Sequence, residues 1–424
     1  MDHPYQPARA WRIAALLFFF MVINFMDKIA VGLLAVPMMS ELHWSATQFG
    51  LLASSFFWLF PMAGVLGGFI ADRHPTQRVL LAMAAIWTLC QLPMALSSSL
   101  AVLVFARVLL GIGEGPAFPV AVHACYKWFP DSRRNMPVAL LSMGSAIGLL
   151  LAGVCVPLVS AHWGWRANFL VLAAFTVAWM LAWLVLGGEG PLDGHDGRQA
   201  PVVRLQARLP YRRLLADRTV LGCMLMRFVA YWGLALTLTW MPAYLQQGLG
   251  FDAVRAGRLY ALIVLVTIPF MIGLPWYSQR LLARGVSSRV GRGLLSALTL
   301  VLGGALFALM PGEGISTPLR VALLAVGAGL VPVIYTLGPA MLAEVVPPAQ
   351  RGAILAIDNS VASMAGALAP LVSGLLIERF EGARGYELGF ATCGALMVVG
   401  GLLGGWLAKP ERSMRTLMPP AAGV

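Results

Sequence analysis

Long runs of apolar positions recur along the whole chain and are separated by short polar segments. Twelve runs reach roughly 20 residues, the length an α-helix needs to cross the ~30 Å hydrocarbon core of a bilayer. They occupy positions 12–36, 48–71, 79–97, 100–126, 137–160, 165–187, 219–247, 257–280, 291–311, 319–345, 352–378 and 386–408. The pattern predicts an all-α membrane protein with twelve transmembrane helices.

The longest polar connection, residues 188–218, lies between the sixth and seventh runs. It is rich in Gly, Pro and Arg, which is typical of a cytoplasmic linker, and a short interfacial helix is expected near Tyr211–Leu215. We therefore predict an N-terminal six-helix bundle over 1–187, a linker over 188–218 and a C-terminal six-helix bundle over 219–424.

The two halves contain a weak internal sequence repeat. "WFPDSRR" opens the fifth run and "VVPPAQR" opens the eleventh, so that Pro130 and Pro347 are as far apart as Arg134 and Arg351. Internal repeats of this kind occur in many transporters, whose central site lies where the repeats meet. The two bundles are therefore expected to be pseudo-symmetric.

The charges change the picture of what the chain binds. Only 11% of residues are charged, against about 25% in soluble domains, while the net charge is +12. With both termini on one side, and with basic residues near the ends of a run counted with the adjoining loop, that side holds 21 of the 30 Lys and Arg and the other side holds 6. The remaining 3, Lys28, Arg107 and Arg227, lie deeper within the runs. Because basic loops stay in the cytoplasm, the bias predicts cytoplasmic termini, and nucleic acid is not an expected partner.

Two opposite charges interrupt the fourth run. Arg107 and Glu114 are seven positions apart and so share one helix face. Gly111, Gly113 and Gly115 permit a close neighbouring helix, and Pro116 and Pro119 interrupt the hydrogen-bond ladder. A charge inside a membrane costs at least ~2.5–3.5 kcal/mol and usually marks function. The alternative is a structural ion pair. In the functional interpretation, Arg107 neutralises Glu114 until an anion binds.

Asp27 and Lys28 interrupt the first run. As neighbours on a helix they point about 100° apart, so that one can face a cavity while the other turns sideways. The alternative is that Lys28 only neutralises Asp27 or Glu114.

Three further polar residues lie within runs of the second half. Asn359 is expected either to bind a ligand or to bond to another helix, and Asp358 either acts at depth or benefits from the dipole at a helix start. Arg227 is expected to extend towards the cytoplasm.

The loop "GGFIADRHPTQR" joins the second and third runs on the predicted cytoplasmic side. Its charges, Asp72, Arg73 and Arg78, bracket a tight turn. They indicate a charge-paired latch between helices.

Several kinds of enzyme site are missing from the sequence. No lysine lies in a phosphate-binding loop motif, and neither G-x-S-x-G nor H-E-x-x-H is present. The six histidines are scattered, so no metal site is indicated. We expect no enzyme activity and no cofactor.

The motifs "NFMDK", "RVLLGIGEGPAFP", "KWFP", "TWMPAYL" and "NSVASMAGALAPLVSG" together resemble the anion:cation symporter family of the major facilitator superfamily. The family includes bacterial galactonate, glucarate and hexuronate transporters. The resemblance implies the major facilitator fold. It also implies that Asp27 and Glu114 bind protons and that Arg107 couples Glu114 to an anionic substrate.

The chain departs from the family in ways that bear on the substrate. Lys28 stands where an arginine is usual, Phe25 replaces a common tyrosine, and Val120–Ala121–Val122 replaces a more polar stretch. Because hydroxyl and amide partners are lost, the departures favour a less hydroxylated or aromatic carboxylate over a sugar acid.

The resemblance implies a proton-coupled symporter that imports a small organic anion, a carboxylate or sugar acid, across a bacterial cytoplasmic (inner) membrane by alternating access. A monomer in the lipid bilayer is expected, with the proton as coupling ion. The substrate-binding residues are expected to be Arg107, Lys28, Asn359, Tyr231, Trp232 and Tyr335. Alternatives are an anion exchanger or exporter on the same fold, and a non-transporting receptor.

Overall fold

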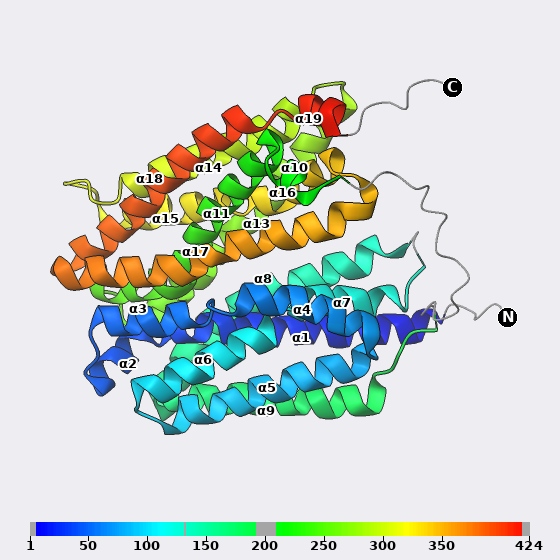
Figure 1. Cartoon of the computed structure of the whole chain (residues 1–424). Helices are drawn as coiled ribbons and strands as arrows, with labels where there is room; N and C mark the ends of the chain where they lie inside the picture. The colour runs from blue at the N-terminus through cyan, green and yellow to red at the C-terminus, as the bar shows by residue number, and fades with distance from the viewer. Residues whose placement is uncertain (1–5, 131–132, 192–208, 418–424) are drawn as a thin grey trace, which may run out of the picture. The chain divides into compact units, whose positions relative to one another are not determined.

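The computed structural model describes residues 6–130, 133–191 and 209–417, except the side chains of Asp72 and Ala349. Within these ranges it contains helices and no strand, and twelve helical segments are long and apolar enough to cross a membrane (Figure 1). The predicted all-α fold with twelve transmembrane helices is therefore confirmed. The predicted linker lies mostly in residues 192–208, outside the described ranges.

Most spanning segments are single helices. Three others are interrupted by non-helical residues, and a fourth begins with a π-helical turn that continues directly into an α-helix. The single helices are α1 (Pro7–Leu33), α5 (Thr76–Leu96), α8 (Asn135–Trp163), α9 (Trp165–Leu186), α11 (Arg218–Thr239), α13 (Ala253–Ala283), α17 (Arg351–Arg379) and α18 (Ala383–Leu407). The interrupted segments are α3 (Ala46–Ser55) with α4 (Phe60–Arg73), α6 (Leu100–Glu114) with α7 (Ala117–Tyr126), and α15 (Thr317–Leu330) with α16 (Val333–Val345), and the fourth segment is η3 (Arg289–Leu294) with α14 (Leu295–Ala308). The break after Glu114 confirms the interruption predicted at Pro116.

The remaining elements are short: α2 (Ala35–Leu42), α10 (Tyr211–Leu215), α12 (Met241–Ala243), η2 (Tyr244–Gly248), η4 (Pro348–Gln350) and α19 (Pro410–Leu417). The chain forms two compact units. The first comprises Met1–Ala200 and Leu238–Ala261, and the second comprises Pro201–Thr237 and Leu262–Val424. The predicted division at 188–218 stays a prediction.

In the first unit, α1 packs along α8 and α5 packs along α9. Aromatic rings fill the space between α1, α5 and α9. Phe20 stacks on Trp87 with ring centroids 4.5 Å apart, and Trp179 stacks on Trp183 at 5.3 Å. The indole N–H of Trp179 donates to the backbone oxygen of Leu16 at 2.8 Å, whereas the indole N–H of Trp87 is buried without a hydrogen-bond partner. This core is therefore held together chiefly by apolar and aromatic packing.

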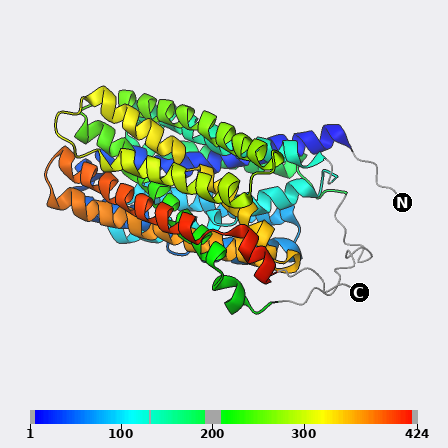
Figure 2. The same cartoon turned by 90° about the horizontal axis from the view of Figure 1, so that it is seen from above.

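In the second unit, α14 and α18 pack most extensively. The helices approach at Gly304 and Gly394, where an added Cβ atom on either residue would lie under 3 Å from the other's backbone oxygen. The short helix α10 lies beside α19 (Figure 2), and Arg213 donates to the backbone oxygen of Thr416 at 3.1 Å. The helix predicted at Tyr211–Leu215 is therefore confirmed.

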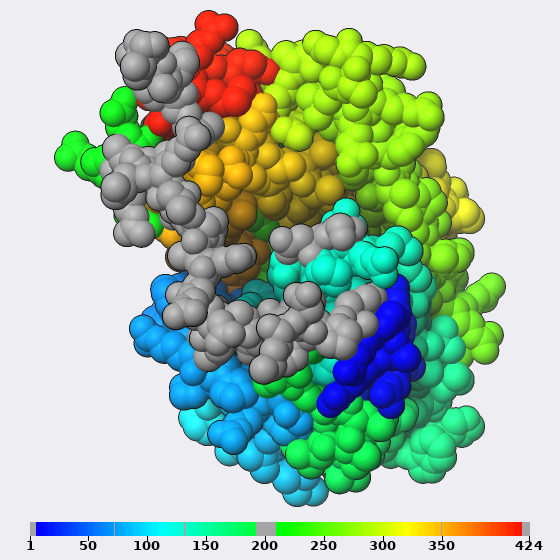
Figure 3. Space-filling model, turned by 90° about the vertical axis from the view of Figure 1, so that its right-hand side faces the viewer, coloured from blue at the N-terminus to red at the C-terminus, as the bar shows by residue number. Residues whose placement is uncertain are grey.

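At one end of the first unit lie the start of α1, the connection from α4 to α5, and the end of α9 (Figure 3). Arg9, Arg73 and Arg78 belong to this end and are exposed. It is the end that the distribution of basic residues assigns to the cytoplasm, and that orientation stays a prediction.

Candidate functional site

The first unit buries a cluster of charged side chains between α1, α5 and α6. Asp27 and Lys28 come from α1, Gln91 from α5, and Arg107 and Glu114 from α6. Lys28 is largely buried and the other four are buried. The sequence predicted the four charged members, and helix packing brings them together.

Lys28 is the partner of Glu114. Its Nζ atom donates to Oδ1 of Asn24 at 2.6 Å and lies 3.5 Å from Oε2 of Glu114. Lys28 reaches this carboxylate from a neighbouring helix because α1 packs close enough. Among the described residues the direct ion-pair partner of Glu114 is Lys28, while Arg107 acts on Glu114 only through its charge at longer range. The role predicted for Arg107 stays a prediction.

Arg107 forms no ion pair within the described ranges. It is only 3% exposed, its guanidinium carbon lies 4.6 Å from the ring centroid of Phe56, and its Nε atom has no hydrogen-bond partner. Asp27 and Glu114 lie near enough to interact with it electrostatically. The cluster thus contains a buried cation that neither carboxylate pairs with directly.

Gly111 explains how Phe56 comes so close to Arg107. A Cβ atom at Gly111 would lie 1.9 Å from the backbone oxygen of Phe56, and one at Gly115 would lie 2.5 Å from that of Phe60. Both contacts are possible only for glycine. The close approach that the sequence predicted for these glycines is confirmed, and it places an aromatic face under the guanidinium.

Gln91 is the member that sequence analysis missed. Its Nε2 atom donates to Oδ2 of Asp27 at 2.6 Å, while Oδ1 of Asp27 has no hydrogen-bond partner. The signal that could have found it is that Gln91 is the single amide within the apolar run 79–97. The bond fixes one oxygen of Asp27 and leaves the other available to a proton.

The second unit buries its own charged pair. Nη1 of Arg227, on α11, forms an ion pair with Oδ2 of Asp358, on α17, and Nη2 donates to Oδ1 of Asn359 at 3.2 Å. Arg227 is 6% exposed, so the expectation that it extends towards the cytoplasm is wrong. An acidic partner on a facing helix holds it at depth. Asn359 makes an interhelical hydrogen bond, one of its two predicted roles.

Two of the predicted aromatic residues lie beside this pair. The guanidinium of Arg227 is 5.7 Å from the ring centroid of Tyr335, on α16, and Tyr335 meets Tyr231 edge-to-face at 6.4 Å. Trp232 is buried on α11 and lies 6.4 Å from Phe228. The second unit therefore gathers Asn359, Tyr231 and Tyr335 around Arg227.

The predicted latch residues show no ion pair among the side chains described. Arg73 and Arg78 are exposed, and the side chain of Asp72 lies outside the description. Thr76 and Gln77, which lie between these two arginines, instead form hydrogen bonds with a carboxylate. The sequence assigns that carboxylate only to the linker. That carboxylate is Glu189, shortly after α9.

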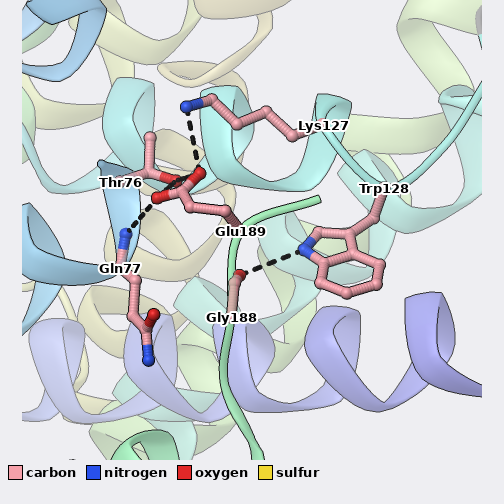
Figure 4. Close-up of polar contacts among 6 residues, drawn as sticks. All are labelled: Thr76, Gln77, Lys127, Trp128, Gly188 and Glu189. Carbon is pink, nitrogen blue, oxygen red and sulfur yellow. Dashed lines mark hydrogen bonds and ion pairs between the residues drawn. The ribbon is translucent and has the colours of Figure 1, made fainter. Parts of the chain in front are cut away.

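Glu189, which follows α9, connects the end of that helix to the start of α5 and to the end of α7 (Figure 4). It accepts hydrogen bonds from the backbone N–H of Gln77 at 2.8 Å, the hydroxyl of Thr76 at 3.0 Å and Nζ of Lys127 at 3.1 Å. Thr76 begins α5, so the carboxylate also faces the positive end of a helix dipole. The start of the linker is therefore fixed to α5 and to the residue after α7.

No group of three His, Cys, Asp or Glu that could hold a metal ion occurs among the residues described. The two clusters instead offer cations, carboxylates, amides and phenols at membrane depth. Such groups can bind an anion and exchange protons.

The fold and the two buried clusters define a multi-pass membrane transporter, a class distinct from enzymes. The chain belongs to the Major Facilitator Superfamily, whose profile matches residues 16–333 and 281–421. The resemblance predicted at this level is confirmed.

Two bacterial proteins are similar to this chain in sequence, and one solved structure is similar to it in fold. A probable sulfoacetate transporter of Cupriavidus necator is 28% identical, covering 90% of this chain and 89% of the relative. A hexuronate transporter of Bacillus subtilis is 25% identical, covering 92% and 94%. A bacterial homologue of the human lysosomal transporter Spinster, solved inward-facing and occupied, shares the fold with a TM-score of 0.81 at 16% identity, over 99% of this chain and 100% of that one.

Proposed function

We propose that this protein is a proton-coupled symporter that moves a small organic anion, a carboxylate or sugar acid, across a bacterial cytoplasmic membrane by alternating access. The termini face the cytoplasm. Two similar proteins are named as transporters of organic anions, sulfoacetate and hexuronate. Their names support an anionic substrate.

Arg107 is the observation that carries the proposal. Burying an unpaired cation costs several kcal/mol, of the order of the ~2.5–3.5 kcal/mol of the lenient insertion scale. Arg107 accepts this cost without forming an ion pair among the described residues. A planar guanidinium suits a carboxylate, which it can bind with two parallel hydrogen bonds. We infer that the substrate's anionic group binds there, with Lys28 as a second positive charge.

Asp27 and Glu114 supply the coupling. With both carboxylates ionised, their charges balance those of Lys28 and Arg107. A proton on either carboxylate leaves the cluster positive and favours an anion, so proton and anion bind together. By linkage the effect is reciprocal, with a typical size of about 1–3 kcal/mol.

Four residues of the second unit are also proposed to bind the substrate. Asn359, Tyr231, Trp232 and Tyr335 offer an amide, two phenols and an indole at membrane depth. Aromatic faces and a few polar atoms are the usual lining of a site that binds a small organic molecule. This lining is compatible with an aromatic or sparsely hydroxylated carboxylate.

The test is uptake into liposomes that contain the purified protein, with labelled sulfoacetate, glucuronate and benzoate. An inward proton gradient should drive accumulation of at least one anion above equilibrium. Asp27→Asn and Glu114→Gln should reduce this accumulation more than they reduce exchange at equal pH, while Glu387→Gln, which alters a carboxylate paired with Arg320, should not change the ratio of accumulation to exchange. Equal accumulation with and without the gradient would contradict symport.

The same vesicles separate the alternatives. An exchanger or exporter would show counterflow of the labelled anion without net gradient-driven uptake, and a receptor would bind the anion without moving it. Orientation is tested in intact cells with a cysteine at Arg212. A membrane-impermeant reagent applied from outside should not label it, and labelling would reverse the proposed topology.

A further inference from the structure

The charged pair of the second unit holds polar atoms that lack partners. Nε of Arg227, Oδ1 of Asp358 and the hydroxyl of Tyr335 are buried and make no hydrogen bond. They come from three helices, α11, α17 and α16. Buried polar groups are almost always hydrogen-bonded, so three unsatisfied groups around one guanidinium indicate that the site accommodates a further polar group.

The chemistry of the site selects an anion. Arg227 is the only cation named in this cluster, and its Nε–H donor and the Tyr335 hydroxyl can both donate to an incoming carboxylate. An ionised Asp358 repels that carboxylate, because both groups are negatively charged and both would bind the guanidinium of Arg227. Adding a proton to Asp358 removes the repulsion while leaving Asn359 on Nη2.

We propose that Arg227 and Asp358 form a second, proton-linked anion site, in which Asp358 takes up a proton when Arg227 binds an anionic group of the transported molecule. The charges balance in this step: the proton neutralises Asp358 and the anion replaces it as the counter-charge of Arg227. The inference rests on the proposed symport and deepens it by adding one proton and one anion anchor within the second unit.

The surroundings leave Asp358 as the acid of this site. The titratable groups near it and Arg227 are the thiol of Cys223 and the phenol of Tyr335, and Tyr231 and Cys393 lie next to Tyr335. Thiols and phenols of model peptides titrate near pH 8.5 and pH 10 and carboxyls near pH 4. Within the physiological range, the carboxylate is therefore the charged acid of the site that a proton can neutralise.

The test is the binding of sulfoacetate and of glucuronate to the full-length protein in detergent between about pH 5 and pH 8. Wild-type affinity should fall with rising pH, and Asp358 should contribute up to about a tenfold loss per pH unit. Asp358→Asn should remove that contribution and bind at alkaline pH at least as tightly as wild type. Arg227→Gln should weaken binding at least tenfold at every pH, and Arg227→Lys less.

Glu387→Gln is the matched control, because Glu387 pairs with Arg320 elsewhere in the same unit. It should keep the wild-type pH profile. A wild-type slope in folded Asp358→Asn, or wild-type affinity in Arg227→Gln, would overturn the inference and leave the proposed symport intact. Failure of the wild type to bind either probe, together with no accumulation of sulfoacetate, glucuronate or benzoate in the liposomes, would contradict both.

A second measurement does not depend on a neutral variant that folds. The infrared difference spectrum of the wild type on adding the bound probe should show a newly protonated carboxyl group. Asp358→Glu, which keeps a carboxylate on a longer side chain, should shift that band. An identical band in both proteins would assign the proton elsewhere and overturn the inference.

Discussion

Arg107 and Arg227, the two arginines that are buried among the described residues, are held in opposite ways. Arg227 is closed into an ion pair with Asp358 and a hydrogen bond to Asn359. Arg107 lies on the Phe56 ring with Nε unpartnered, and the carboxylate on its own helix lies 3.5 Å from Lys28 instead. The same residue type is thus a bonded partner in one unit and an unpaired cation in the other.

In the anion-free protein, this difference separates an arginine whose ion pair stabilises the fold from an arginine that has no such pair. In a closed pair each charge depends on the other, since removing one leaves a buried charge without compensation. An unpaired cation contributes little to folding and remains available to a ligand. We therefore expect the two sites to respond differently when each is altered, and the following predictions test that contrast.

The largest expected effect on stability is at Asp358. Asp358→Ala leaves Arg227 buried without its acid, which should lower the free energy of unfolding by about 3–5 kcal/mol. The measurement is equilibrium unfolding by SDS in mixed micelles. Arg166→Ala, which breaks an exposed pair with Glu41 and leaves the hydrogen bond from Trp165 to Glu41 in place, should cost no more than about 1 kcal/mol. Equal losses in the two variants would show that the Arg227 pair is not the closed unit described here.

A smaller effect is expected at Gly111, which positions the unpaired cation. Gly111→Ala places a Cβ atom 1.9 Å from the backbone oxygen of Phe56. Such overpacking should lower the free energy of unfolding by about 1–3 kcal/mol. The shift should also move Phe56 away from Arg107 and weaken anion binding. Gly68→Ala is the control, because nothing lies within 4 Å of its added Cβ atom. Thermal unfolding and anion affinity that match this control would argue against the close approach.

The sequence could predict the fold because each spanning helix carries its own signal of length and hydrophobicity. The predicted run 100–126 matches α6 and α7, Leu100 to Tyr126, with the break where Pro116 was expected. It could also name the buried charges of the two clusters, since charge within a membrane stands out. It could not say which charges meet, because the partner of Glu114 depends on how α1 packs against α6. Arg227 was misjudged for the same reason, since its acid lies on α17.

The smallest expected effect concerns an exposed carboxylate and its dependence on pH. Partial burial acts to raise the pKa of Glu41, but hydrogen bonds from Trp165 and Arg166 and the charge of Arg166 outweigh it, so that the pKa lies below its usual value. Glu41 therefore stabilises the fold above the unfolded pKa of about 4.3, and the contribution disappears as pH falls through the lower folded pKa.

The difference in unfolding temperature between wild type and Glu41→Gln measures this contribution. It should be small at pH 7, because exposed ion pairs contribute about 0–1 kcal/mol, and should shrink towards pH 3. A difference that grows on acidification would reverse the assigned direction of the pKa shift. Either result provides a surface reference for the two buried sites.

The most direct test of the central claim is thermal unfolding of wild type and Arg107→Gln, each with and without the anion that the liposomes accumulate. Without anion, Arg107→Gln should unfold at or above the wild-type temperature, because a buried cation without an ion pair has been removed. With anion, the wild type should gain stability as RT ln(1 + [L]/Kd), and the variant should gain almost none. A variant that is less stable alone yet equally stabilised by the anion would show that Arg107 is a structural residue, and would contradict the account.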